Sequence, residues 1–501
     1  MITGRWKLFL NLFGGLIILF WLVMIGTLIK KTTSIEVSGD DVLDIGSMVI
    51  ETGKREWKDI FLKGKKVGYS INLIKPFDDG YFIQDEIFLK INLMGMGRGL
   101  YAITQSMVDK QFFLKSFYFK MSSGIVNSII SGKVDGDQIF IHTGKGKDRR
   151  MRRIQLAEPP MISTGMGYLF RTMKISVGDS FRLPFFDPST MVQKSAVLKV
   201  TGKEHLKINR VDYDAFRVET EMWGKPMAFW IDKSGTILKE ETFMGLMMIK
   251  SSAANAPMNI DGTGGEDFYE MAAVPVDKQL PKVAKLNYLK LKLKGAADTE
   301  ALRFDWNSGR QKFSHDIMEI KLEKQPFKIT YAVPYEGSDH DLSRFLMPEF
   351  NIESDAEEII EKARDIRGDN RNPVFVSRRL LYWVYENIDK KPVVSIPSAL
   401  EVLRSRVGDC NEHATLLAAL LRASGIPARL SIGLVYSRNK FFYHAWTEAF
   451  VGEWVTMDAT LNQMPTDVSH IRLMHGNLDK QVEIMGFIGK LQCEVLDFGY
   501  D

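Results

Sequence analysis

The chain has 501 residues, which is too long for one ordinary hydrophobic core, so we expect two or three domains. Apolar residues make up 45% of the sequence and charged residues 26%, a globular composition that argues against long disordered stretches. The formal net charge of +4 is small for this length and gives no case for a nucleic-acid partner.

The cysteine content excludes several classes of protein. Only Cys410 and Cys493 are present, so the chain can form one disulfide at most and is not a disulfide scaffold. It has no C-x-x-C pair, no dense cluster of histidine and cysteine, and no calcium loop of the D-x-[DN]-x-[DN]-G type. We therefore expect no metal and no cofactor.

An uncharged apolar stretch runs from Leu8 to Ile29, with two basic residues on each flank. At about 1.5 Å per residue a helix of this stretch reaches across the hydrocarbon layer of roughly 30 Å. We predict a membrane anchor over residues 1–31, with the bulk of the chain on the periplasmic or extracytoplasmic side of the inner membrane. The alternative is a cleaved signal peptide, but the stretch is long for one and no A-x-A site follows it.

Residues 36–252 are predicted to form a β-rich, mostly antiparallel domain. Segments such as "YFIQDEIFLKINL", "QIFIHT" and "YDAFRVETEMW" alternate apolar and polar residues and are separated by turns. One face of the sheet should be covered by a helix of its own or by another domain. The order of the strands resembles bacterial envelope domains built as a curved, half-open β-barrel. That resemblance implies a concave face for an apolar or glycan ligand, whereas the alternative is a spacer and packing platform.

A basic segment, "GKGKDRRMRR", spans Gly144 to Arg153. It could bind phosphates of lipid headgroups or an anionic wall polymer. The simpler interpretation is a solvated hairpin, which we favour because no aromatic residues are interleaved. Further along, residues 253–340 combine a linker rich in small residues with a small β unit.

Residues 341–501 form the predicted last domain, which begins with helices. Ser354 is the predicted N-cap of the first helix, with Glu357 completing a capping box. Pro373 suits the first turn of the second helix. Ser398 and Glu401 repeat the capping-box pattern at the third.

The stretch "GDCNEHATLLAALLRASG" places Cys410 in the first turn of a leucine-rich helix. Unpaired N–H groups and the positive end of the helix dipole stabilise a thiolate there, so we predict a lowered thiol pKa and a nucleophile. A structural cysteine would more naturally lie on the leucine face further along the helix. Cys493 lies in an alternating strand and is predicted to be buried.

A base for this nucleophile follows in "FFYHAWTEAFVGEWVTMDAT", which is typical of two strands joined by a tight hairpin. If the hairpin is centred on Val451, then His444 and Asp458 are cross-strand neighbours on one face. The carboxylate can hold the imidazole tautomer while the other ring nitrogen serves Cys410. His413, His470 and His475 are left outside this set.

The segment from about residue 354 to 475 resembles the transglutaminase-like superfamily, a branch of the papain-like cysteine fold. "SALEVLRSR", "GDCNEHATLLAALLRASGIPARLSIGL" and "YHAWTEAFVGEWVTMDAT" carry the resemblance. It maps the catalytic nucleophile onto Cys410, the base onto His444 and the orienting acid onto Asp458. Ala459 stands where many members have proline. The expected fold class is α+β, a papain-like core of a helix-borne cysteine on an antiparallel sheet.

Together these features predict a membrane-anchored cysteine enzyme that acts on amide bonds by acyl transfer through a thioester. Hydrolysis and transfer to an amine share one triad and remain open. The resemblance leans toward a protein or peptide amide substrate, such as an envelope protein or wall peptide. The alternative is a non-catalytic envelope module for binding or assembly that uses the same fold and the β-rich domain.

Overall fold

The computed structural model describes residues 54–500, except for 125, 145–148, 174, 223–224, 243–244, 262–266, 296–305, 477–482 and 485–487. The predicted anchor at residues 1–31 and four residues of the predicted basic segment, 145–148, lie outside the described residues. In the part that is described, no helix has both the length and the apolar character needed to cross a membrane.

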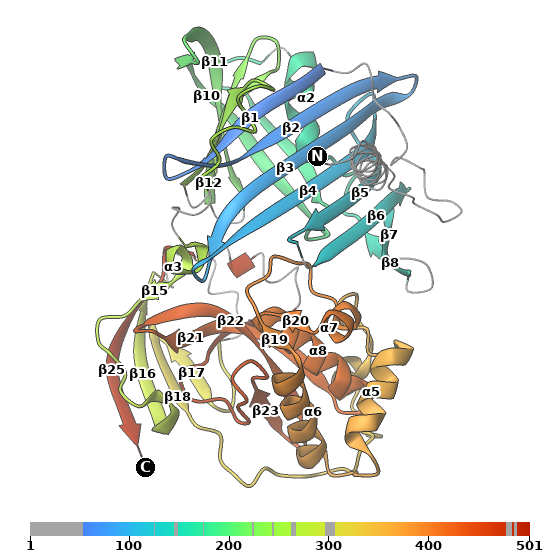
Figure 1. Cartoon of the computed structure of the whole chain (residues 1–501), viewed down its shortest axis with the longest axis vertical. Helices are drawn as coiled ribbons and strands as arrows, with labels where there is room; N and C mark the ends of the chain where they lie inside the picture. Colours follow the sequence, from blue (N-terminus) through green and yellow to red (C-terminus); the bar gives the residue numbers. More distant parts are fainter. Residues whose placement is uncertain are drawn as a thin grey trace, which may run out of the picture. The chain divides into compact units, whose positions relative to one another are not determined.

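A large antiparallel sheet forms the β-rich part of the chain and confirms a β-rich domain (Figure 1). Within the described residues its fourteen strands follow the order β8 to β1 and then β14 to β9, so the first strand pairs with the last. The strands are β1 Lys54–Leu62, β2 Lys65–Phe77, β3 Gly80–Leu93, β4 Met96–Asp109, β5 Leu114–Ser122, β6 Asn127–Asp135, β7 Gln138–Thr143, β8 Arg150–Gln155, β9 Ser180–Asp187, β10 Val192–Ile208, β11 Val211–Met222, β12 Lys225–Asp232, β13 Ile237–Glu241 and β14 Leu246–Ser251.

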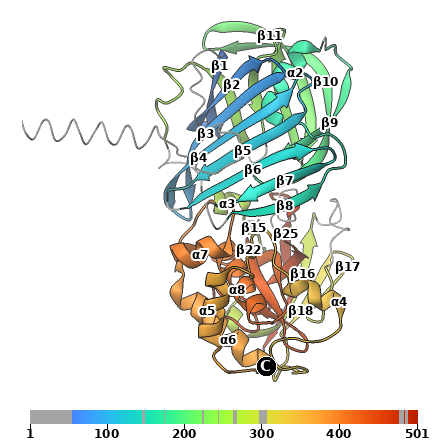
Figure 2. The ribbon, with the colours of Figure 1, turned by 90° about the vertical axis from the view of Figure 1, so that its right-hand side faces the viewer.

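The two arms of this sheet, β1–β8 and β9–β14, curve around a short helix, α2 (Met166–Thr172), which Figure 2 shows between them. Just before α2, Met161 forms isolated bridges to Phe113 and to Phe185, which belong to opposite arms. Phe117 of β5 and Phe186 of β9 are fully buried, with ring centroids 5.6 Å apart. The arms therefore share one apolar core.

A smaller sheet of four strands joins the middle of the chain to its end. Its described strands follow the order β17-β18-β16-β25, and Leu291 of β16 pairs with Val495 of β25. The small β unit predicted for 253–340 thus also takes in the last strand of the chain, which carries the buried Cys493. The elements here are α3 Phe268–Ala272, β15 Val274–Pro275, β16 Leu286–Lys294, β17 Gln311–Ser314, β18 Ile317–Lys321 and β25 Gln492–Tyr500.

The remaining elements form a helical layer on a second small sheet, in which the described strands follow the order β15-β22-β21-β24 and β23 pairs with β22. Helix α8 lies at the centre, because it contacts α5, α6 and α7 as well as β21 and β22. The elements are α4 His340–Ser343, α5 Glu357–Arg367, α6 Pro373–Asn387, β19 Asp389–Lys390, α7 Ala399–Ser405, β20 Val407–Gly408, α8 Cys410–Ala423, β21 Ala428–Ser437, β22 Lys440–Phe450, β23 Trp454–Met457 and β24 Ile471–His475.

The helix starts agree with the sequence in two of three cases. Pro373 opens α6 after the N-cap Asn372, and the Ser398 hydroxyl accepts a hydrogen bond from the Glu401 N–H at the start of α7. The prediction for Ser354 is wrong, because α5 begins only at Glu357 and its N-cap residue makes no side-chain cap. Residues 352–356 form a tight turn whose backbone hydrogen bonds occupy the place of a first helical turn.

We expect Leu417→Ala to destabilise the last domain strongly, by about 2–5 kcal/mol, because Leu417 is fully buried in α8 and the truncation leaves a cavity. Phe375→Ala on α6 is the control, since 47% of Phe375 is exposed. Urea and thermal unfolding followed by circular dichroism would measure both variants. Equal losses of stability would contradict the central position of α8.

Candidate active site

Cys410 is the first residue of α8, as the sequence predicts. The Asp409 carboxylate accepts a hydrogen bond from the Asn411 N–H (2.9 Å), and the Glu412 carboxylate accepts one from the Asp409 N–H (2.9 Å). These reciprocal bonds form a capping box that holds the start of the helix rigidly. The thiol is therefore carried on a backbone with little freedom to move.

Gly408 is explained by this capping box. The Glu412 side chain folds back toward the start of the helix, and a Cβ on Gly408 would lie 2.2 Å from the Cβ of Glu412. Any larger residue at this position would displace the cap. The glycine, the aspartate and the cysteine of the "GDC" motif thus form one structural unit.

His444 and Asp458 are brought together, although not by the register expected. Strands β22 and β23 pair Phe450 with Trp454, so the hairpin is centred on Gly452 and not on Val451. Strand β23 ends at Met457, and Asp458 instead pairs with Gln463 through two backbone hydrogen bonds of 2.9 and 3.0 Å. This turn aims the Asp458 carboxylate back at the imidazole, where Oδ2 lies 2.7 Å from His444 Nε2.

His470 is a second partner of Asp458 that sequence reasoning missed. Its Nε2 lies 3.1 Å from Asp458 Oδ2, and its Nδ1 lies 3.3 Å from Asp467 Oδ1. Burial alone would lower the pKa of His470, but the two carboxylates outweigh it and raise that pKa. Since carboxylates only accept hydrogen bonds, both ring nitrogens carry a proton and His470 is an imidazolium.

The electrostatics of the pair formed by His444 and Asp458 follow from these contacts. Burial lowers the pKa of His444, but Asp458 and Cys410 outweigh it and raise that pKa to about 9. Burial favours protonation of Asp458, yet the two imidazoles hold its pKa well below the usual range. At neutral pH Asp458 is therefore ionised and His444 carries a proton.

The pKa of the Cys410 thiol differs from the prediction. Burial and the Asp409 carboxyl raise the pKa of Cys410, and the hydrogen bond from His444 only partly opposes them. The predicted lowering by the helix start is wrong for the resting protein, because removal of water penalises the thiolate more than the helix N-terminus stabilises it. Asp409 has a raised pKa itself, through burial and the nearby Glu412.

Tyr269 of α3 is another residue that the sequence analysis did not identify. Its hydroxyl donates a hydrogen bond to Asp409 Oδ2 (3.0 Å), and it lines a cavity of about 270 Å³ together with Cys410, His444 and Leu461. Burial and Asp409 raise the pKa of Tyr269, so its hydroxyl stays protonated. No sequence signal could have found it, since the linker has no motif and the contact joins positions far apart in the chain.

Among the described residues, His444, Asp458 and His470 also have the side-chain types of a metal site, with ligand atoms within 4.8 Å of one another. The contacts of 2.7 and 3.1 Å are hydrogen-bond distances, whereas zinc lies about 2.0–2.2 Å from nitrogen and oxygen ligands. Both nitrogens of His470 already face carboxylates. The arrangement is that of a hydrogen-bonded cluster.

A family model covers the segment that contains Cys410, His444 and Asp458. Residues 360–459 match the model of the transglutaminase-like superfamily, which confirms the resemblance for this segment and places it among cysteine-enzyme-like domains. Residues 59–250 match a family of proteins of unknown function, DUF3108. The search of curated proteins gives no match.

Several solved structures are similar to parts of the chain. One is a candidate cysteine protease from Cytophaga hutchinsonii, with 20% identity, a TM-score of 0.31 and coverage of 43% of this chain and 90% of that one. A β-barrel-like protein of the family DUF1849 from Brucella abortus has 10% identity, a TM-score of 0.32 and coverage of 40% and 96%. A candidate protease from Parabacteroides distasonis has 11% identity, a TM-score of 0.20 and coverage of 71% and 68%.

We expect iodoacetamide to alkylate Cys410 slowly at neutral pH, with a rate that rises through a midpoint above that of a free thiol, about 8.5. The His444→Ala variant should move this midpoint to higher pH, because it removes the imidazole that lowers the thiol pKa. If the thiol pKa of the variant is higher by one, alkylation at pH 8 becomes about tenfold slower. Both proteins would carry Cys493→Ser, so that Cys410 is the thiol whose alkylation is measured. An identical profile in the two proteins would show that the thiol and the imidazole do not interact.

Proposed function

We propose that the transglutaminase-like segment is a thiol-dependent acyl-transfer enzyme that acts on amide bonds of proteins or peptides. The observation that carries this proposal is the hydrogen-bonded series from the Cys410 thiol to His444 and from His444 Nε2 to Asp458. A nucleophile, a base and a group that orients the base are the three parts such chemistry needs. Cys410 and His444 line a cavity that can receive a substrate.

The reaction begins with loss of one proton from the pair of Cys410 and His444. The remaining proton stays on His444, because ionised Asp458 stabilises the imidazolium, so the reactive form is a thiolate beside an imidazolium. The sulfur attacks the amide carbonyl carbon, and the Cys410 N–H at the start of α8 is placed to stabilise the oxyanion. The C–N bond then breaks as His444 gives its proton to the departing amine, which leaves a thioester.

A second nucleophile completes the cycle. Water or an amine gives a proton to His444 and attacks the thioester carbonyl, and the thiolate leaves with the proton on the imidazole. Hydrolysis releases an acid and aminolysis releases a new amide. The residues that carry the reaction are the same for both acceptors, so the identity of the acceptor depends on access to the cavity.

A membrane location is part of the proposal. The uncharged stretch from Leu8 to Ile29 supports an anchor in the inner membrane. We propose that the enzyme lies on the periplasmic side. Envelope proteins or wall peptides are the amides available there. We therefore propose an envelope protein or wall peptide as the substrate.

Activity can be tested with a mixture of fluorogenic peptide amides, with hydroxylamine added as an amine acceptor that traps the acyl-enzyme as a hydroxamate. Cys410→Ser should lower turnover by at least about 10³-fold, because the hydroxyl is a far weaker nucleophile beside the same base. Cys493→Ser is the matched control and should keep full turnover, since Cys493 is buried in β25 and does not line the cavity. Turnover that persists in Cys410→Ser would contradict the mechanism. A thiol that stays inert at every pH would favour the non-catalytic binding module.

The anchor can be tested by fractionation of cells that express the full chain or a chain lacking residues 1–31. The full chain should remain in the membrane pellet after a carbonate wash, because an apolar helix of this length inserts stably. The shortened chain should be released. A full-length gene product found as a shorter soluble species would instead identify a cleaved signal peptide.

A further inference from the structure

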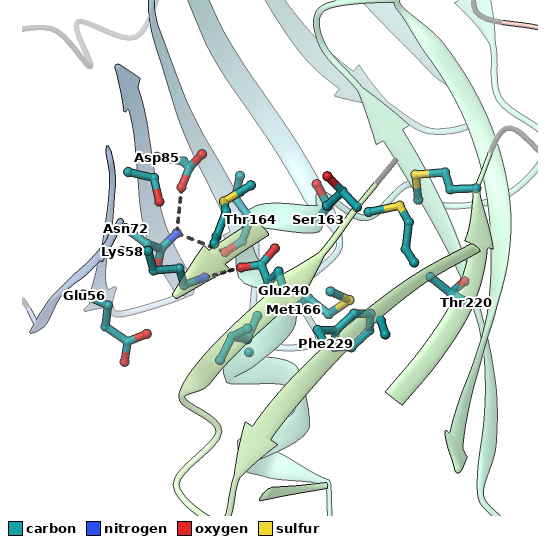
Figure 3. Close-up of a pocket in the computed structure, with 18 of the residues that line it drawn as sticks. Glu56, Lys58, Asn72, Asp85, Ser163, Thr164, Met166, Thr220, Phe229 and Glu240 are labelled. Carbon is teal, nitrogen blue, oxygen red and sulfur yellow. Dashed lines mark hydrogen bonds and ion pairs between the residues drawn. The ribbon is translucent and has the colours of Figure 1, made fainter. Parts of the chain in front are cut away.

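A second cavity, of about 280 Å³, lies inside the β-rich domain between the two arms of its sheet (Figure 3). Residues from β1, β2, β3, α2 and β11–β14 line it, so it belongs to the curved sheet and not to the thiol site. Its size is close to the lower limit of pockets that bind small molecules, roughly 300 Å³. Neither the family match nor the proposed enzyme gives this cavity a role.

Charged and amide side chains gather at one end of the cavity (Figure 3). Lys58 of β1 forms a buried ion pair with Glu240 of β13. Beside it, the Asn72 amide donates to the backbone oxygen of Thr164 (3.1 Å) and more weakly to Asp85 Oδ1 (3.4 Å). These groups lie in the interior of a β-rich domain, where an uncompensated charge costs several kcal/mol.

Carboxyl groups outnumber cations at this end. Three carboxyl side chains line it, Glu56, Asp85 and Glu240, against the single ammonium of Lys58. Glu240 is paired with Lys58, whereas the side chain of Asp85 has only the long amide contact from Asn72 within the described part of the chain. Burial raises the pKa of Asp85 to about 7, with Lys58 opposing this effect. Within the described residues, Asp85 therefore lacks a close positive partner and can take one from a bound cation.

The rest of the cavity is apolar and easily deformed. Phe229 and four methionines, Met166, Met222, Met227 and Met248, contribute to its lining. Unbranched thioether side chains adapt to ligands of different shape and make favourable contacts with aromatic rings. Within the described residues, the hydroxyl oxygens of two lining residues, Tyr168 and Thr220, are buried and have no hydrogen-bond partner.

We propose that this cavity binds a small molecule or chain end that carries a protonated amine on an apolar body. The ammonium group lies against Asp85, and the apolar body lies among the methionines and Phe229. An anionic headgroup would meet three carboxyl groups and is disfavoured. The uncharged glycan or purely apolar ligand suggested by the shape of the sheet would leave Asp85 without a positive partner.

The pH dependence of binding follows from the charges. A bound ammonium favours the ionised form of Asp85, so binding releases a proton and strengthens as the pH rises from 6 to 8. The groups that face or surround Asp85 are Lys58 and Glu56 on β1, Glu86 on β3, Glu240 on β13 and Tyr168 on α2. Burial and Glu56 raise the pKa of Tyr168 to about 12, so its hydroxyl stays protonated over this range.

The experiment titrates the full chain, labelled with ¹³C at its methionine methyl groups, with 2-phenylethylamine and with the matched 2-phenylethanol and 3-phenylpropanoate. We expect saturable shifts of Met227 and Met248, assigned by their leucine variants, while the exposed Met347 stays unshifted. The amine should bind at least about tenfold more tightly than the alcohol, and the carboxylate more weakly still. Binding of the amine should strengthen from pH 6 to pH 8.

Two variants identify the groups responsible. Asp85→Asn keeps the shape of the side chain. It should weaken binding of the amine by about tenfold and leave binding of the alcohol unchanged. Thr220→Leu fills part of the cavity and should weaken binding of all three probes. This variant provides the test if Asp85→Asn does not fold. Absence of saturable shifts with every probe would overturn the proposal. So would a carboxylate that binds as tightly as the amine.

Discussion

The buried carboxylate of Asp458 is the constraint on which the candidate active site depends. It is almost completely buried and accepts hydrogen bonds from His444, from His470 and from the N–H groups of Thr460 and Leu461. A buried charge persists only when its hydrogen-bonding capacity is satisfied in this way. The same contacts fix the ring of His444 and select which of its nitrogens faces the thiol. Loss of Asp458 would leave two buried imidazoles without their shared partner.

The protonation state of the Cys410 thiol depends on burial and on the charges near it. Helix α8 is surrounded by other helices and by β22, so its first residue lies in a site with little water. Burial and Asp409 keep Cys410 protonated at rest, while His444 stabilises the thiolate. Reactivity therefore depends on the protonation of a pair and not of a cysteine alone.

The β-rich domain also contains charged side chains in its interior. Lys58 and Glu240 form an ion pair inside the curved sheet, and Asp85 lies near them with weaker compensation. In the active site the Asp458 carboxylate accepts four hydrogen bonds from protein groups, whereas Asp85 in this cavity accepts only the long contact from Asn72 within the described residues. That contrast distinguishes a site whose partners are internal from one that can take its last partner from a ligand.

The sequence by itself determined the local features. Amphipathic periodicity, alternation and capping residues predicted the β-rich domain, the position of Cys410 at a helix start and the hairpin that carries His444. These signals are local because hydrogen bonds within a helix and the two-residue period of a strand depend on near neighbours.

Tertiary structure alone decided the rest. His470 and Tyr269 reach the site from loops and linkers, β25 pairs with a strand about two hundred residues earlier, and burial reverses the expected pKa shift of Cys410. Such effects depend on which distant segments pack against one another and bury each other's side chains. A local sequence pattern does not contain that information.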